Sequence, residues 1–282
     1  MLKIVDSHIH FWDINLLQYD WLAGQPVINR TFLPTDLAQQ AAQVDLQKIV
    51  FVQCDCLPYQ GLQEVAWVSR LAEQEPRIQA IVAFAPLEKG AAARDELQAL
   101  AAYPLVKGVR RLIQSEGPGF CVRPDFIRGV QLLAEFGYSF DLCILHHQLP
   151  EVIKLVEQCP EVRFVLDHLG KPAIKAGLLN PWREHLKSLA SFPHVACKIS
   201  GAVTEADLEQ WTPADLQPYI EYALEVFGPD RVMYGGDWPV SLLATTYQTW
   251  IETQASLTVK LPAEEKDKLF YQNACAFYRL PE

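Results

Sequence analysis

Three histidines and one aspartate are the side chains of this sequence best suited to chemistry. His8 and His10 lie two residues apart in the first apolar run, where strand alternation places them on one face together with Asp6. His168 and Asp237 each end a later apolar run. If these runs are parallel strands, the side chains meet at the C-terminal ends, and three neutral imidazoles with a carboxylate suit Zn²⁺ or a similar cation. One pair of histidines at a strand end would usually be structural, with its hydrogen bonds satisfied. Here histidine or aspartate recurs at three strand ends, which indicates a site.

Two basic residues extend the candidate site toward a substrate. Arg110 points inward and Arg111 outward in the register that we favour for the fourth run, although a slip of one residue would exchange them. Lys198 lies within the seventh run, and a lysine buried there needs a carboxylate or a substrate oxygen as its partner. The alternative is a lysine at the rim of the fold. We expect Arg110 and Lys198 to bind substrate.

Aromatic residues and one further histidine are candidates for the wall of a pocket. Residues 11–34 form a long aromatic stretch after the first run, which we expect to be a loop beside the reaction centre. Trp12 in this loop and Trp238 next to the aspartate could stack on a sugar ring, or they could pack the loop itself. At the end of the fifth run, His147 is the expected substrate contact, and His146 is the alternative.

The elements that must position these residues alternate regularly along the chain. Eight apolar runs of strand length are separated by amphipathic stretches with helical spacing. Eight such units favour parallel pairing and closure into a (β/α)₈ TIM barrel, a single domain over residues 1–282. An open doubly wound sheet would usually have a Gly-rich turn after its first strand, where this chain has histidines. The expected strands are Lys3–Ile9, Lys48–Gln53, Ile78–Ala85, Val106–Ile113, Tyr138–Leu145, Val162–Leu166, Val195–Ser200 and Arg231–Gly235.

The composition limits the class of partner. The chain has Asp+Glu 34 against Lys+Arg 24, a formal net charge of −10, which disfavours nucleic acid and anionic lipid as partners and favours a small neutral substrate. No apolar run is long enough to span a membrane. The seven cysteines, including the Cys54 and Cys56 pair, are interpreted as structural thiols in a reducing cytoplasm. We expect a cytoplasmic monomer or homodimer without a signal peptide.

Three motifs support a resemblance to a known family. DSHIHFWD at the start, VLDHLGKP in the sixth unit and YGGDWPV in the eighth resemble the amidohydrolase superfamily, in particular its amidohydrolase-2 branch. The stretch KISGAVTEADLEQW is similar to the L-fuconolactonase and L-rhamnonolactonase-like sugar-lactone hydrolases of that branch. The match extends from Lys3 to the FYQNACAFYRL tail.

The resemblance implies roles for the four site residues. His8, His10 and His168 would be metal ligands, and Asp237 would bind metal and also handle the proton of the attacking water. The fourth strand has no lysine at the position that bridges two metals in binuclear members, unless Lys107 is that residue. We therefore expect one divalent ion, zinc first and manganese second, or catalysis without a held ion.

The expected activity is hydrolysis of a sugar-acid lactone. Asp237 would take a proton from water, the hydroxide would attack the lactone carbonyl, and Arg110 and Lys198 would stabilise the oxyanion. A non-oxidative decarboxylase of the same branch, a lactonase for aromatic-pathway lactones and a metal-dependent deoxyribonuclease are the alternatives, the last disfavoured by the acidic charge. A binding protein that has lost catalysis would have little use for the intact set of histidines and aspartate.

Overall fold

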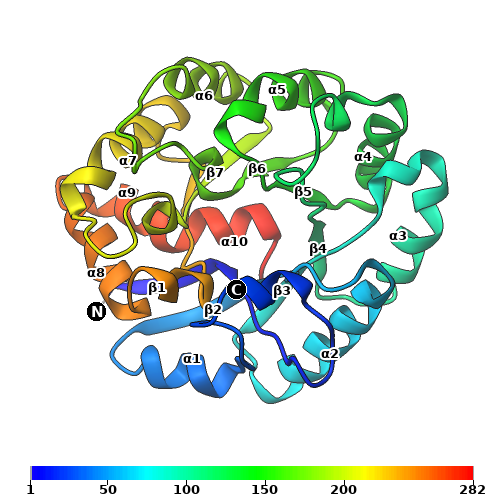
Figure 1. Ribbon diagram of the computed structural model, residues 1–282, viewed down its shortest axis with the longest axis horizontal. Helices are drawn as coiled ribbons and strands as arrows, with labels where there is room; N and C mark the ends of the chain where they lie inside the picture. Colours follow the sequence, from blue (N-terminus) through cyan, green and yellow to red (C-terminus); the bar gives the residue numbers. More distant parts are fainter. Residues whose placement is uncertain (1, 282) are drawn as a thin grey trace.

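The computed structural model describes residues 2–281, which form a ring of eight parallel strands surrounded by helices (Figure 1). The strands follow one another around the ring in chain order, and each pairs in parallel with the next. This arrangement confirms the (β/α)₈ barrel expected from the sequence. The strands are β1 Lys3–Ile9, β2 Asp45–Val52, β3 Ile78–Ala83, β4 Val106–Val109, β5 Ser139–Leu142, β6 Phe164–Leu166, β7 Val195–Ile199 and β8 Val232–Tyr234.

Each strand is followed by a helix that covers the outside of the ring. In α4, Pro124 begins the helix and Gly137 ends it with a φ of 67°, the usual placement of proline at the start and glycine at the end of a helix. None of the helices within residues 2–281 is long and apolar enough to cross a membrane. The covering helices are α1 Pro34–Gln40, α2 Gly61–Gln74, α3 Arg94–Leu100, α4 Pro124–Phe136, α5 Leu149–Glu157, α6 Trp182–Ala190, α7 Pro213–Phe227 and α8 Tyr247–Leu257.

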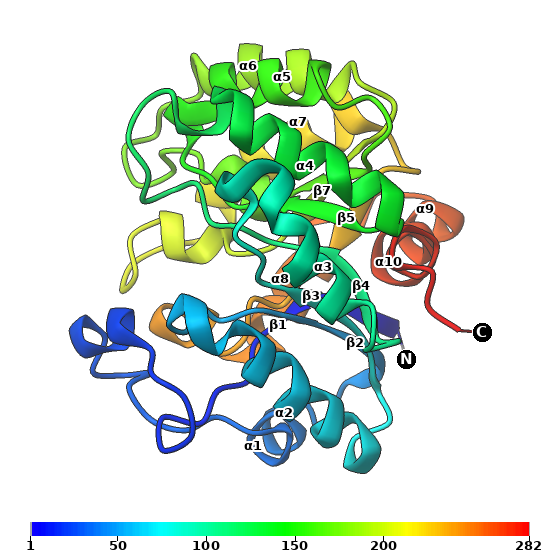
Figure 2. The same ribbon diagram turned by 90° about the vertical axis from the view of Figure 1, so that its right-hand side faces the viewer.

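The barrel is closed at its base by the C-terminal segment. After α9 (Ala263–Asp267), α10 (Asn273–Tyr278) packs against β1 and β8. Tyr278 is buried among interior side chains such as Val5 and Val165. Figure 2 shows α9 and α10 beside the start of β1, with the blue loop after β1 reaching out at the other end. The long loop therefore belongs to the end where the strands finish, as the sequence predicted.

The seam between β8 and β1 is closed by residues of the candidate site. The backbone N–H of His10 donates to the carbonyl of Trp238 at 2.8 Å, and the N–H of Asp237 donates to the carbonyl of His8 at 2.8 Å. Two of the bonds that close the barrel thus also fix the backbone of three of the four candidate residues.

A bulge in β1 aims the histidines inward. Against β2, the register shifts between Asp6 and Ile9, so β1 contains one extra residue there. The carboxylate of Asp6 points outward, where Tyr247 of α8 donates to it at 2.8 Å. The expectation that Asp6 shares a face with His8 and His10 was wrong, because the bulge reverses the alternation between them.

Candidate active site

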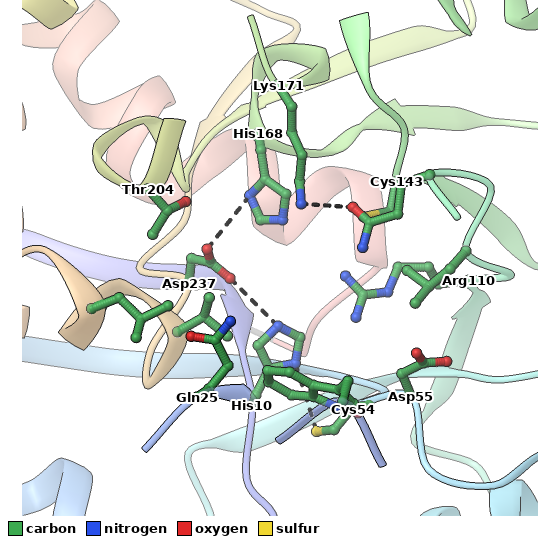
Figure 3. A pocket seen from close by; sticks show the side chains of 15 residues that line it. His10, Gln25, Cys54, Asp55, Arg110, Cys143, His168, Lys171, Thr204 and Asp237 are labelled. Carbon is green, nitrogen blue, oxygen red and sulfur yellow. Dashed lines mark hydrogen bonds and ion pairs between the residues drawn. The ribbon is translucent and has the colours of Figure 1, made fainter. Parts of the chain in front are cut away.

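A cavity of about 230 Å³ opens at the C-terminal ends of the strands. Figure 3 shows His10, Arg110, His168, Lys171 and Asp237 converging on it from different parts of the ring. Loops after β1, β4, β7 and β8 form its upper walls. The cavity is therefore positioned where the sequence places its chemically active residues.

The four predicted residues come together in one cluster. Nε2 of His8 lies 3.2 Å from Nε2 of His10. Oδ1 of Asp237 lies 3.5 Å from Nε2 of His10 and 3.8 Å from Nε2 of His8. Nδ1 of His168 is 3.9 Å from Oδ2 of Asp237 and 2.9 Å from the Ser200 hydroxyl.

Two of these residues are held in left-handed backbone conformations. His168 has a φ of 53° and Asp237 a φ of 52°, a region that costs a residue with a Cβ roughly 1–2 kcal/mol. The left-handed conformation continues through Leu169, Gly170 and Lys171, and only at Leu169 and Lys171 does a Cβ make it unfavourable. A buried hydrogen bond of 2.8 Å from the Trp182 indole to the Leu169 carbonyl holds this turn. Strain of this kind persists where the surrounding fold enforces it, often at functional sites.

Close packing also explains a glycine beside the cluster. A Cβ on Gly201 would lie 2.5 Å from Nδ1 of His168 and 3.0 Å from Oδ2 of Asp237. Any larger residue would push the imidazole or the carboxylate out of place. Gly201 therefore permits the approach of β7 to the two side chains.

The imidazoles are neutral and their tautomers follow from their neighbours. Burial lowers the pKa of His8 and His10, and it lowers the pKa of His168 to about 4. The ring of His10 uses Nδ1 to donate to the Val52 carbonyl at 2.7 Å, which leaves a lone pair on Nε2. Nδ1 of His8 faces Oδ1 of Asp167 at 3.3 Å, so its Nε2 also carries a lone pair. Two lone pairs thus point at one small space.

This donor set fits one divalent ion. Two nitrogens bound to a tetrahedral Zn²⁺ at 2.0–2.1 Å lie about 3.3 Å apart, close to the 3.2 Å between the two Nε2 atoms. Burial acts to raise the pKa of Asp237, but the neighbouring His168, His10 and His8 outweigh it and hold the pKa below its ordinary value. An ionised carboxylate oxygen is therefore the third donor, and the ligand atoms of His8, His168 and Asp237 also lie within 4.8 Å of one another, so His168 is a further candidate ligand.

Arg110 occupies the opposite side of the cluster. Its guanidinium lies 3.2 Å from Nε2 of His8 and 3.4 Å from Oδ2 of Asp167, and it also donates to the Gln53 carbonyl. Arg111 points outward and pairs with Glu88 and Glu116. The register of β4 is the one that the sequence favoured.

Lys198 lies beneath the site. Its Nζ is 2.6 Å from Oδ2 of Asp141, 3.0 Å from Oδ1 of Asp167 and 3.2 Å from Nδ1 of His8, all of them buried. Burial opposes its charge, but Asp141 and Asp167 outweigh that and raise the pKa of Lys198. The structure therefore gives Lys198 carboxylate partners, and the expectation that it binds substrate was wrong, because it does not line the cavity.

Two other expected contacts lie away from the cavity. Trp12 is buried behind it, where its indole donates to the Arg30 carbonyl at 2.6 Å. Trp238 is buried at ring-centroid distances of 5.9 Å from Phe11 and 5.4 Å from Phe32. The expectation of a stacking wall from Trp12 and Trp238 is corrected, because both rings pack the loop, which was the structural alternative for these aromatics.

The fifth strand also presents a different side chain. His147 is exposed in a short helical turn after β5, so it was wrongly expected to contact substrate, and His146 lies in the same turn. Cys143 lines the cavity instead, with its thiol 3.5 Å from the amide oxygen of Gln114. The chain turns outward after Cys143, which removes both histidines from the site.

Several residues of this site were not predicted from the sequence. Trp21, not Trp12, is the tryptophan of the loop that lines it, held by a 2.8 Å bond to the Cys54 carbonyl. Asp167 and Lys171 flank His168 within the VLDHLGKP motif but received no role. Asp167 could have been found as the carboxylate that a buried Lys198 requires. For Lys171, only the left-handed turn reveals the direction of the side chain.

Comparisons with known proteins agree with the fold and the motifs. A family model described as amidohydrolase matches residues 5–280. The chain is 35% identical to an L-fucono-1,5-lactonase of Burkholderia multivorans, covering 99% of this chain and 96% of that one. It is 26% identical to an L-rhamnono-gamma-lactonase of Scheffersomyces stipitis, covering 99% of each. A crystal structure of an amidohydrolase from Burkholderia multivorans with bound Zn has a TM-score of 0.90 at 34% identity, covering 99% of this chain and 100% of that one.

Proposed function

This chain belongs to the amidohydrolase family, and on that premise we propose that it hydrolyses a sugar-acid lactone, with L-fucono- and L-rhamnono-lactones as the first substrates to consider. The observation that carries the proposal is an ionised Asp237 at the cavity, flanked by His10 and facing the Arg110 guanidinium. A base and a fixed cation on opposite sides of one small cavity suit addition of water to an ester carbonyl.

The reaction follows from these positions. Asp237 accepts a proton from water while the hydroxide adds to the lactone carbonyl carbon. Negative charge develops on the carbonyl oxygen, where Arg110 donates hydrogen bonds. The bond from the carbonyl carbon to the ring oxygen then breaks, and Asp237 returns its proton to the departing alkoxide. The product is an open-chain hydroxy acid, which ionises and releases one proton to solvent.

We also propose that His8, His10 and Asp237 hold one zinc ion, with His168 beside them. When bound, such an ion supplies Lewis-acid polarisation and lowers the pKa of a coordinated water to about 7. Manganese is the second candidate. The cavity is built from one chain, so a cytoplasmic monomer suffices for this role and a homodimer is compatible with it.

A proton-release assay tests the proposal. A panel of L-fucono-, L-rhamnono-, D-galactono- and L-arabinono-lactones would be measured with a pH indicator, using metal-stripped, zinc-loaded and manganese-loaded protein. Rapid opening of one or two stereochemically related lactones is expected. Silence across the panel in every metal state would contradict the assignment and direct attention to aromatic lactones and to CO₂ release.

The variant Asp237→Asn separates the mechanism from the substrate assignment. Asparagine has the same shape and also tolerates the left-handed backbone, so the fold should persist. Loss of the base should reduce kcat by about 10²–10⁴-fold. A folded variant with full lactonase activity would remove Asp237 from the mechanism.

A further inference from the structure

Lys171 enters the cavity because of the left-handed turn that follows β6. His168, Leu169, Gly170 and Lys171 have φ values of 53°, 58°, 69° and 49°. The backbone N–H of Lys171 donates to the carbonyl of His168 at 2.8 Å, which closes the turn. The side chains of its first and last residues both line the cavity (Figure 3). A right-handed continuation would send Lys171 elsewhere.

The ammonium group is oriented by one neighbour across the cavity wall. Nζ of Lys171 donates to the amide oxygen of Gln114 at 2.6 Å. Glu205 lies 4.0 Å from Nζ on another side, and the Lys171 side chain is 19% exposed. An ammonium has three N–H donors, so at least one stays available to a molecule in the cavity.

Lys171 also fixes the orientation of the Gln114 amide. An ammonium can only donate, so Gln114 must present its oxygen to Lys171. The thiol of Cys143 approaches the same oxygen at 3.5 Å. The amide NH₂ group of Gln114 is consequently directed away from both and is free to donate. Lys171 and Gln114 together form a pair of adjacent donors on the cavity wall.

We propose that this donor pair, Lys171 and Gln114, binds hydroxyl oxygens of the lactone ring and selects among sugar lactones by their configuration. The inference rests on the proposed function and specifies its substrate class as a polyhydroxylated lactone. Two neighbouring donors with one positive charge match two hydroxyl oxygens on adjacent ring carbons. A site that donates to a substrate hydroxyl discriminates strongly against an analogue that lacks it, because the donors are then left unpaired. The pair binds and orients the substrate, while Asp237 carries the proton.

The test compares variants on lactones that lack single hydroxyls. Lys171→Met removes the charged donor, and Gln114→Glu keeps an acceptor for Lys171 while removing the NH₂ donor. Each should lower kcat/KM for the preferred lactone by about 10- to 100-fold. On the monodeoxy lactone that lacks the contacted hydroxyl, wild type should itself be impaired and the variants should add little loss. Lys171→Arg should restore part of the activity, because it keeps a donor.

A matched control lies four residues along the chain. Lys175 is also in the loop after β6, but its side chain is 70% exposed and pairs with Asp207 at 3.1 Å. Lys175→Met removes the same charge and should leave kcat/KM unchanged, and thermal melting should show every variant folded. These results would exclude a general effect of net charge.

The outcomes separate this inference from the proposed function. Wild-type inactivity on all lactones would overturn the lactonase assignment and this inference with it. An active wild type with unchanged kcat/KM in Lys171→Met and Gln114→Glu would overturn the donor pair alone. Equal losses on every deoxy lactone would assign the pair a structural role. A selective loss on carboxylated lactones would show that the pair binds a carboxylate and not a hydroxyl. Either result overturns the proposal.

Discussion

His8 is approached by a cation at each of its ring nitrogens. Lys198 lies 3.2 Å from Nδ1, and the Arg110 guanidinium lies 3.2 Å from Nε2. A neutral imidazole has a single lone pair, and the contact with Asp167 places it on Nε2. If His8 holds a divalent ion as proposed, Arg110 and that ion would compete for the same electron pair.

This competition predicts that Arg110 weakens metal binding. Removing the guanidinium in Arg110→Met should tighten zinc binding at least about tenfold, because the positive charge that lies against Nε2 of His8 and repels the ion is then absent. The affinity would be measured by competition with a chelating dye on metal-stripped protein. Arg111→Met, which removes the outward arginine next to Arg110 in the sequence, is the control and should bind zinc like wild type. Equal affinities in both variants would refute the competition.

For individual residues, spacing and residue type identified the cluster but not its surroundings. His8, His10, His168 and Asp237 could be found because histidine and aspartate at strand ends are unusual. The roles of the aromatic residues could not, since a tryptophan has the same periodicity whether it packs a loop or lines a cavity. Partners such as Asp141 come from other strands, and only the closed ring shows which ones meet.

Among the elements, β5, β6 and β7 are joined by one buried ionic group. Lys198 of β7 bridges Asp141 of β5 and Asp167, which directly follows β6. Burial raises the pKa of Asp141 to about 6 despite the contact with Lys198, which acts to lower it. Both carboxylates are fully buried, so solvent does not reach them in place of the lysine.

Loss of this lysine should destabilise the barrel. Lys198→Met leaves the buried Asp141 without a cation and Asp167 with Arg110 alone, and breaking a buried ion pair in this way typically costs about 3–5 kcal/mol. Urea unfolding followed by circular dichroism would measure the free energy of unfolding. Lys175→Met breaks an exposed pair and should change it by less than about 1 kcal/mol. A small effect at Lys198 would mean that the two aspartates are already protonated.

The first turn of α2 contains a buried carboxyl whose titration should make the free energy of unfolding depend on pH. One oxygen of Glu64 accepts from the backbone N–H of Cys54 at 3.1 Å, and the other has no hydrogen-bond partner among the described residues. Burial raises the pKa of Glu64 to about 8, opposed by the Cys54 N–H and by Arg110. The folded state therefore binds this proton more tightly than the unfolded chain does.

The sign of the pH dependence follows from this raised pKa. The stabilisation is complete below the unfolded pKa of 4.5 and is lost as the pH rises toward 8, by up to about 1.4 kcal/mol per pH unit. Glu64→Gln should lack this loss. Between pH 5 and 8 its free energy of unfolding should therefore rise relative to that of wild type, by up to about 1.4 kcal/mol for each pH unit. Urea titrations at several pH values would measure the difference. Glu73→Gln, on an exposed residue of the same helix, should follow wild type, and a flat difference for Glu64→Gln would contradict the argument.

The order and type of the elements could be read from the sequence, whereas their local irregularities could not. Apolar periodicity located every strand and indicated helical stretches between them, because burial of one face dictates it. The bulge in β1 and the left-handed turn at 168–171 leave that periodicity unchanged. Both depend on contacts with distant segments, such as the Trp182 indole and Tyr247, that hold an otherwise unfavourable backbone.

For the whole molecule, the C-terminal helix is part of the barrel interior. The hydroxyl of Tyr278 donates to Oδ2 of Asp141 at 2.7 Å, and its ring lies 5.4 Å from Nζ of Lys198. The network that supports His8 from below is thus completed by a residue near the end of the sequence. The base of the barrel and the reaction centre are therefore connected through one buried ionic group.

Tyr278→Phe should weaken the hydrogen-bonded network beneath His8 without creating a cavity, because the ring is kept. It removes one hydrogen bond to a buried carboxylate, which should cost about 1–3 kcal/mol of the free energy of unfolding. Thermal and urea unfolding would measure the change. Tyr271→Phe, on a partly buried tyrosine of the same segment, is the control and should have a smaller effect. Equal stability of both variants would show that the Tyr278 hydroxyl contributes nothing.

The position of α10 has a consequence for biosynthesis. A nascent chain that has just finished β8 holds every strand and three residues of the candidate cluster, His8, His10 and His168. Asp237 follows three residues later, and Tyr278 is made 44 residues after Tyr234. Until that segment leaves the ribosome, Asp141 and Lys198 have an open base and the interior is accessible to water. The ring is therefore expected to reach its native state only after synthesis of α10, so that a ribosome-bound chain arrested after β8 would remain sensitive to protease.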